Sequence, residues 1–246
     1  MKSSDSQLKS RGKITFENLQ HYNNHSEIEL LEIIKSKEAY KRTIAIRLLS
    51  EKNDLNHELI HLFLQTLTQE NKLYTKIELC DALSKGNVQS AKIMVEYLGQ
   101  IGNNQQKVLP TNGFNKKSYP LPRDIIARTL AHMKKEILPV LLDVLKTDNT
   151  LAIREVIDAI GFMCFYNKIH SDNQIIDVLL LCLKTNYKDD ITRWKLVRAF
   201  ESFNTINVIQ TLMDIERNDN QPIVRNEAKR SLEIIINRTE KSSRRE

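Results

Sequence analysis

The chain has 246 residues, which is enough for one large domain or two small ones with a substantial buried core. Its six glycines and five prolines are too few for a turn-rich β protein and favour helices. The formal charge of +6 is concentrated at the ends, because the first 13 residues carry +3 and the last ten carry +2, which leaves +1 for residues 14–236. A DNA-binding domain usually places its basic residues on one face of the fold, so this charge only weakly supports nucleic-acid binding.

Other bulk features exclude several classes of protein. Cys80, Cys164 and Cys182 are too far apart for a CxxC metal or redox motif, so we expect buried free thiols in a reducing compartment. The longest apolar run, residues 178–183, is far shorter than a membrane span, and the N-terminus lacks the apolar core of a secretion signal. No phosphate-binding loop or nucleophile motif occurs. We therefore expect a cytoplasmic protein with no cofactor and no membrane segment.

The two ends of the chain are polar. Residues 1–24 are rich in Ser, Asn, Gln and Lys without a sustained period, which predicts a mostly disordered segment. Regular structure is expected to begin near Ser26, the predicted N-cap of the amphipathic stretch SEIELLEIIKS. Residues 239–246 form a basic polar tail. The region between them, residues 25–238, is predicted to be one domain.

The sequence HELIH at residues 57–61 matches the H-E-x-x-H pattern of zinc hydrolases. On a helix, His57 and His61 share a face and could hold zinc, with Glu58 as the general base. The extended form of the motif fails because positions 64 and 67 are both leucine, and the nearest acidic candidate, Glu78, belongs to the next predicted helix. We therefore expect no metal site, with a zinc-dependent hydrolase as a remote alternative.

Six segments share one helical pattern, in which an anchor residue is followed by small or apolar residues at positions +3, +6 and +7. The anchors are Arg42, Lys76, Arg123, Ile153, Arg193 and Arg225, spaced 34, 47, 30, 40 and 32 residues apart. A second amphipathic helix fits between consecutive anchors, and this period is typical of helical hairpins. Because one such pair cannot bury its apolar faces alone, the pattern predicts hairpins stacked into a solenoid.

The clearest copy, QPIVRNEAKRSL at residues 221–232, resembles the HEAT-repeat family, particularly its short phycobilisome-lyase-like type. The resemblance covers about residues 25–238. It implies an all-α, right-handed α-solenoid of about five to six helical hairpins. In this family the anchor arginine and the turn aspartate, here Asp190 and Asp219, usually join adjacent repeats. This implies structural roles for the anchors Arg42, Lys76, Arg123, Arg193 and Arg225.

A long insertion at residues 103–122, NNQQKVLPTNGFNKKSYPLP, interrupts the repeat pattern. It holds three of the five prolines and three lysines without an acidic residue. A loop of this length inside a compact array is usually functional or disordered, and a tolerated insertion is the alternative. Its candidate contact residues are Phe114, Lys116, Lys117 and Tyr119.

A charged row is predicted on the face opposite the buried stripe of each repeat. At 100° per residue, positions +3, +6, +7 and +10 cluster as the buried stripe, whereas +1 and +5 point away. Position +5 is charged in all six copies, and the row consists of Arg47, Asp81, Arg128, Asp158, Arg198 and Arg230. Position +1 adds Arg154 and the only tryptophan, Trp194. The family's second helices line the concave surface, so we expect a charged ridge there, with a solvated face of alternating salt bridges as the alternative.

Trp194 lies one turn before Arg198, where the two side chains could stack. Because tryptophan and arginine are typical of interface hot spots, the candidate binding residues are Arg128, Arg154, Asp158, Trp194, Arg198 and Arg230. We therefore expect a non-catalytic scaffold that binds a protein partner on the concave face, with the loop at residues 105–120 as an accessory contact.

Two further functions remain open. The chain is similar to HEAT-like alkylpurine DNA glycosylases in length, helical pairing and basic pI, and these hold DNA in the same concavity. No residue of this chain can be matched to their catalytic aspartate. A bilin lyase or isomerase role is implied only by the repeat subtype.

Overall fold

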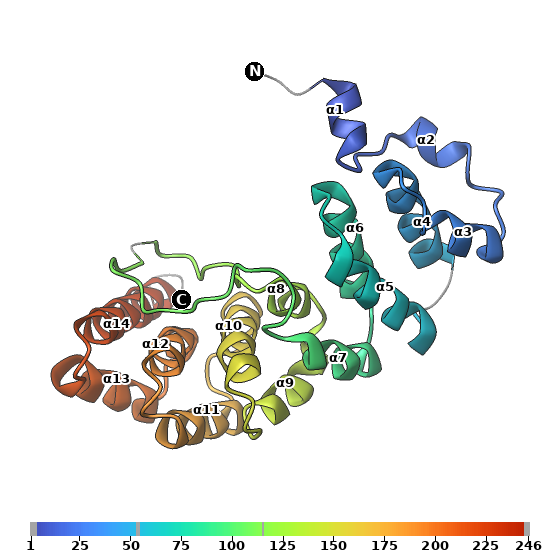
Figure 1. The fold of residues 1–246 in the computed structure, drawn as a ribbon. Coiled ribbons are helices and arrows are strands. Elements are labelled where there is room, and N and C mark those ends of the chain that lie inside the picture. The colour runs from blue at the N-terminus through green and yellow to red at the C-terminus, as the bar shows by residue number, and fades with distance from the viewer. Residues whose placement is uncertain (1–3, 53–54, 115, 244–246) are drawn as a thin grey trace. The chain divides into compact units, whose positions relative to one another are not determined.

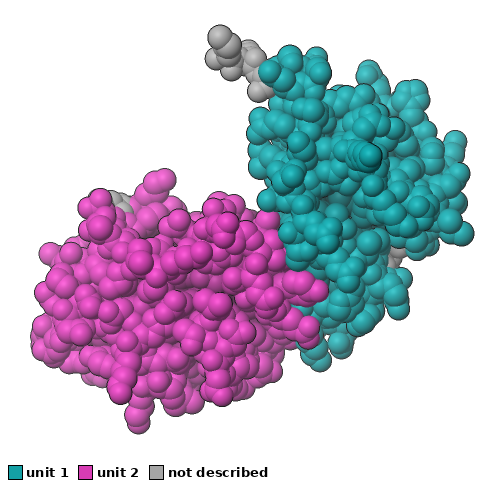
Figure 2. All heavy atoms as spheres, in the orientation of Figure 1, with its two compact units in different colours: residues 1–94 teal, residues 95–246 magenta. Residues whose placement is uncertain are grey.

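The computed structural model of the chain describes residues 4–52, 55–114 and 116–243. These residues form fourteen α-helices and three short 3-10 helices, and none of them lies in a strand (Figure 1). The prediction of an all-α protein is confirmed. The chain divides into two compact units, residues 1–94 and residues 95–246 (Figure 2). The single predicted domain of residues 25–238 is therefore shared between two units.

The first unit is organised around α4 (Ala39–Lys52), which contacts α3 (Glu27–Ile33) and α6 (Leu73–Ser84). The remaining helices of this core are α5 (His57–Gln69) and α7 (Val88–Met94), which contact one another. The predicted cap at Ser26 is present, because its hydroxyl accepts the backbone N–H of Glu29. The anchor Arg42 donates to both carboxylate oxygens of Glu70, at 2.8 and 2.9 Å, which joins α4 to the end of α5.

The N-terminal segment is ordered, so the prediction of disorder is wrong for residues 4–24. Helices α1 (Asp5–Ser10) and α2 (Phe16–Gln20) each begin with a complete capping box, and both contact α4. The ammonium of Lys9 lies 4.1 Å from the ring centroid of Tyr40. Gly12 has φ +93°, and a Cβ there would meet the hydroxyls of Thr43 and Thr75. Local caps and aromatic contacts hold this polar segment, and neither produces a hydrophobic period in the sequence.

The second unit contains three contacting helical pairs. They are α9 (Leu138–Val144) with α10 (Thr150–Tyr166), α11 (Asn173–Thr185) with α12 (Asp190–Ala199), and α13 (Ile206–Asn218) with α14 (Pro222–Ser243). Helix α8 (Ile125–Ala131) contacts α10, α10 contacts α12, and α12 contacts α14. Three 3-10 helices complete the unit, η1 (Val95–Tyr97), η2 (Lys135–Ile137) and η3 (Phe200–Ser202). Asn149, Asp172 and Asp189 cap α10, α11 and α12 through their side chains.

The insertion at residues 103–122, here called the covering loop, runs along α8, α10, α12 and α14 on the side away from α9, α11 and α13 (Figure 1, green). No backbone–backbone hydrogen bond joins its described residues to each other or to a helix. The predicted polar tail begins inside α14, which continues to Ser243, and residues 244–246 lie outside the described part of the chain.

The anchor residues differ in what they join. Arg193 is 1% exposed and donates from Nε to Asp219 at 2.6 Å and from Nη2 to Asp190 at 2.9 Å, which links α12 to the turn between α13 and α14. Arg225 donates to the backbone carbonyl of Asp219 at 2.5 Å. Arg193 and Arg42 therefore each link helices of consecutive pairs, whereas Arg225 bonds the turn of its own helical pair.

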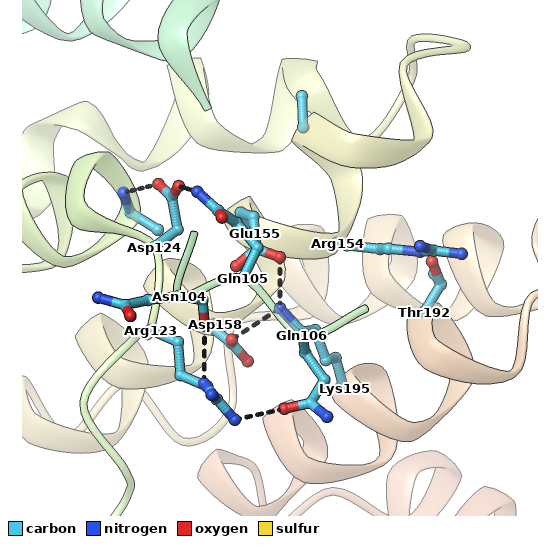
Figure 3. Close-up of polar contacts among 12 residues, drawn as sticks. Asn104, Gln105, Gln106, Arg123, Asp124, Arg154, Glu155, Asp158, Thr192 and Lys195 are labelled. Carbon is cyan, nitrogen blue, oxygen red and sulfur yellow. Dashed lines mark hydrogen bonds and ion pairs between the residues drawn. The ribbon is translucent and has the colours of Figure 1, made fainter. Parts of the chain in front are cut away.

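Two anchors do not follow this pattern. Arg123 is exposed and donates to the carbonyl of Asn104 at 2.8 Å and to Gln106 at 2.7 Å, both in the covering loop (Figure 3). Lys76 is half-buried, and its ammonium is in none of the ion pairs found between described residues. The pattern of small residues around an anchor therefore predicts the helix but not the contact that the anchor makes.

Candidate functional site: a face under a loop

The centre of the predicted charged ridge is buried in the second unit, beneath the covering loop. Asp158, Trp194 and Arg198 are 6%, 5% and 7% exposed, so the expectation that they point into solvent is wrong. Every residue from 191 to 203 is buried. The physical reason is that α12 packs against α10, α11 and α14, while the loop closes its remaining side. We call the loop-facing sides of α10, α12, η3 and α14 the covered face.

A stack of aromatic and guanidinium groups lies at the centre of the covered face. The guanidinium carbon of Arg198 lies 4.0 Å from the ring centroid of Trp194, which confirms the predicted stacking. The ring of Phe114, from the covering loop, lies 5.4 Å from the guanidinium of Arg198 and 5.3 Å from that of Arg230. Arg230 also donates to the carbonyl of Lys116 at 3.1 Å. The loop is therefore held by one aromatic side chain placed over two arginines.

Tyr119 holds the second half of the loop. It is 2% exposed and packs against Phe162 and Phe165, and its carbonyl accepts the hydroxyl of Tyr166 at 3.1 Å. A Cβ on Gly161 would lie only 2.0 Å from the Tyr119 hydroxyl oxygen, so this close approach requires glycine. Burial raises the pKa of Tyr119 well above its ordinary value. Tyr119, expected as an exposed contact residue, is instead part of the core.

Buried ion pairs connect the helices of the covered face. Lys195, 1% exposed, lies 3.0 Å from a Glu155 oxygen and 2.9 Å from an Asp158 oxygen (Figure 3). Arg198 donates twice to Glu227 at 3.2 Å. These pairs satisfy the guanidinium and ammonium charges inside the protein, where an unpaired charge would be costly.

The sequence contained a signal for these pairs that the ridge prediction missed. The four residues Glu78, Glu155, Lys195 and Glu227 all occupy position +2 of the repeat pattern. At three junctions the +5 residue of one copy pairs with an oppositely charged +2 residue of the next copy: Arg47 with Glu78, Asp158 with Lys195, and Arg198 with Glu227. Comparing the charge at +5 with the charge at +2 in the next copy identifies a row of ion pairs between consecutive copies.

Arg230 and Glu201 complete the network. Arg230 pairs with Glu201 and lies 2.8 Å from Glu227, and both carboxylates are fully buried. Burial raises the pKa of Glu201 to about 7, although Arg230 opposes the shift. Burial also raises the pKa of Glu155.

Several polar atoms of this network lack a hydrogen-bond partner among the described residues. They are the carboxylate oxygens Glu155 Oε2, Asp158 Oδ1 and Glu201 Oε1, the Trp194 indole nitrogen, the Tyr119 hydroxyl and the Lys195 ammonium, which makes ion pairs but no hydrogen bond. Each such group destabilises a folded protein by about 1–3 kcal/mol. The loop supplies carbonyl oxygens to the arginines, but none of its described donors is bonded to these three carboxylates.

Two hollows flank the loop. A cavity of about 290 Å³ lies under it, lined by Phe114 and Leu121 from the loop and by Asp158, Trp194 and Arg198 from the helices. An open groove of about 670 Å³ lies beside it, where Val108 and Leu109 face the ends of α10 and α12. Val108 and Leu121 are 71% and 52% exposed, so apolar loop side chains border both hollows.

The remaining predicted binding residues lie at the edges of this site. Arg154 pairs with Asp189 at 2.8 Å in the wall of the open groove. Arg128 is exposed and donates to the carbonyl of Pro122 at 2.9 Å. Lys116 and Lys117 are exposed on the loop. The ridge residues Arg47 and Asp81 belong to the first unit, where Asp81 is exposed.

The histidines of HELIH lie at the start of α5, with their Nε2 atoms 3.3 Å apart. Within the described ranges, no group of three His, Cys, Asp or Glu side chains is arranged to hold a metal ion. Cys164 and Cys182 are buried, and burial raises the pKa of their thiols to about 12 and about 11, which leaves both as poor nucleophiles.

Comparisons with known proteins do not place the chain in a family. No family model matches it, and no curated protein matches it. Two engineered proteins of known structure are similar to it, one at 16% identity over 86% of this chain and 98% of that protein, with a TM-score of 0.35. The other has 15% identity over 87% and 97%, with a TM-score of 0.37. Among the described helices, none is both long and apolar enough to span a membrane.

Proposed function

We propose that the chain is a cytoplasmic, HEAT-like α-solenoid scaffold that binds a protein partner on the covered face without catalysis. The observation that supports the proposal is the packing of the covering loop against the covered face. A segment without backbone–backbone hydrogen bonds lies along α8, α10, α12 and α14, with Phe114 over the guanidiniums of Arg198 and Arg230. A surface that holds its own irregular segment in this way has the chemistry needed to hold another one.

The electrostatics favour a polypeptide over a nucleic acid. Lys195, Arg198 and Arg230 are each paired with a buried carboxylate, so their charge is already compensated. Binding to phosphate depends on cations that can exchange solvent counterions for the phosphate backbone. The paired helices and the link from Arg193 to Asp219 support the repeat architecture, in which the same surface recurs from helix to helix.

The experiment is affinity purification from the cells of origin, followed by mass spectrometry, with three versions of the full chain. They are the wild type, Phe114→Ala, and Phe16→Ala, a matched aromatic truncation in the first unit, where Phe16 is 73% exposed. We expect a set of proteins whose recovery changes with Phe114→Ala and not with Phe16→Ala. Identical recovery from all three versions would refute the proposed binding face.

A further inference from the structure

We propose that residues 104–114 and 116–118 of the covering loop are a displaceable occupant of the covered face, and that the polypeptide replacing them carries an aromatic side chain next to a basic one. This inference rests on the proposed function and specifies the partner and the regulation of the same face. The loop then acts as an internal competitor, and binding requires its release.

The attachment of the loop is limited to a few contacts. Its described backbone makes no backbone–backbone hydrogen bond, so no secondary structure has to be broken to move it. Its beginning is held by Arg123, an exposed side chain, and by Gln105, which donates to the buried Asp124 at 2.8 Å. Its middle is held by Phe114 and the Lys116 carbonyl. Among the loop residues that the structure describes, Tyr119 and Pro122, at its end, are the only buried ones. The segment before Tyr119 can therefore leave while Tyr119 remains anchored.

The aromatic requirement follows from what the loop itself inserts. Phe114 is the loop side chain that lies over both Arg198 and Arg230, and it borders the 290 Å³ cavity. An aromatic ring over two guanidiniums gains cation–π attraction that an aliphatic side chain does not. A partner that lacked an aromatic side chain would lose this interaction and could not compete with the loop.

The basic requirement follows from what the loop fails to supply. Glu155, Asp158 and Glu201 each keep a buried carboxylate oxygen without a hydrogen-bond partner in the described structure. Lys195 pairs with the other oxygens of Glu155 and Asp158, and the two exposed lysines of the loop are bonded to none of these three atoms. A lysine or arginine of the partner, adjacent to its aromatic residue, would donate to these oxygens. This gives the partner an advantage that the loop lacks.

The test begins with a phage-displayed library of random 12-residue peptides, panned on the full-length wild-type chain. We expect the enriched peptides to share an aromatic residue with lysine or arginine within four positions. Enrichment of peptides without a basic residue, or without an aromatic residue, would overturn the assigned chemistry, as would a library that yields no binder.

The second step measures displacement. A synthetic, fluorescently labelled copy of one enriched peptide is titrated with the wild type, Phe114→Ala, Arg123→Ala and the control Phe16→Ala. Because a competing loop weakens apparent affinity in proportion to its occupancy, we expect binding to tighten about tenfold in the two loop variants and to stay unchanged in the control. Arg123→Ala releases the other end of the loop, so it keeps the test valid if Phe114→Ala folds poorly.

The two proposals fail in different ways. Equal affinity for all four chains would mean that peptides bind without moving the loop, which overturns this inference and leaves the proposed binding face intact. In the affinity purification, identical recovery of proteins with the wild type, Phe114→Ala and Phe16→Ala would instead refute the proposed function.

Discussion

The guanidinium carbon of Arg198 lies 4.0 Å from the ring centroid of Trp194, and both side chains are more than nine-tenths buried. Phe114 of the covering loop packs against this pair through the guanidinium of Arg198. Because Trp194 is the only tryptophan in the chain, its fluorescence reports directly on whether the loop is closed.

Replacing Phe114 with alanine should open the loop over Trp194. The variant loses the contacts of the ring with two guanidiniums, which are worth about 0.5–1 kcal/mol each at partly exposed sites. We expect the emission of Trp194 to shift to longer wavelength and to become more accessible to acrylamide. Phe16→Ala, in the first unit, should leave the emission unchanged. An unchanged spectrum in Phe114→Ala would show that the ring does not hold the loop closed.

The Tyr119 hydroxyl is buried, has no hydrogen-bond partner among the residues that the structure describes, and approaches Gly161 closely. Tyr119→Phe removes the unpaired hydroxyl and keeps the ring, so we expect stabilisation by about 1 kcal/mol in urea unfolding. Gly161→Ala should be destabilising, because its Cβ would overlap the Tyr119 hydroxyl. Combining the two changes should recover part of the loss. A destabilising Tyr119→Phe would mean that the hydroxyl has a partner in solution.

Replacing Arg193 should lower the free energy of unfolding more than replacing any other anchor residue. Its guanidinium bonds Asp219 and Asp190 and is 1% exposed, so Arg193→Met leaves Asp219 buried without its charge partner. Breaking a buried pair in this way typically costs about 3–5 kcal/mol. Arg217→Met, at an exposed position of α13, is the control and should change the free energy of unfolding by no more than about 0.5 kcal/mol. Equal effects of the two changes would contradict the joining role.

Glu201 should make the protein less stable as the pH rises. Its folded pKa is raised from 4.5 to about 7, so the folded state binds this proton more tightly than the unfolded state. The contribution is fully present below pH 4.5 and is lost as the pH rises through 7, by at most ~3 kcal/mol. Glu201→Gln should weaken the pH dependence of the urea unfolding midpoint between pH 5 and pH 8, and it should raise the midpoint at pH 8. A pH profile identical to that of the wild type would show that Glu201 does not titrate in this range.

Much of the helical core could be predicted from the sequence, because apolar residues recur with the helical period and turns carry capping residues. Thus α12 and α14 coincide with their predicted copies, and Arg193 joins Asp219 as expected. Helical periodicity identifies which side of a helix faces its partner helix, but it does not show what covers the other side. Trp194 and Asp158 were therefore placed in solvent, although a loop more than 35 residues away in sequence buries them.

The loop itself carried a signal of its packing. Phe114, Tyr119 and Leu109 are large apolar or aromatic residues within a polar insertion, and a fully solvated loop would gain nothing from them. The prediction of disorder in the N-terminal segment fails for a related reason. The order of this segment depends on helix caps and on pairs such as Lys9 with Tyr40, which join residues distant in sequence.

The most direct test of a protein-binding covered face is site-specific photo-cross-linking in the cells of origin. A benzoylphenylalanine is placed at Leu121, an exposed loop position that borders the cavity, or at Phe16 in the first unit as the control. We expect a covalent adduct with a distinct protein from position 121 and not from position 16. Adducts from position 16 alone, or from neither position, would contradict it.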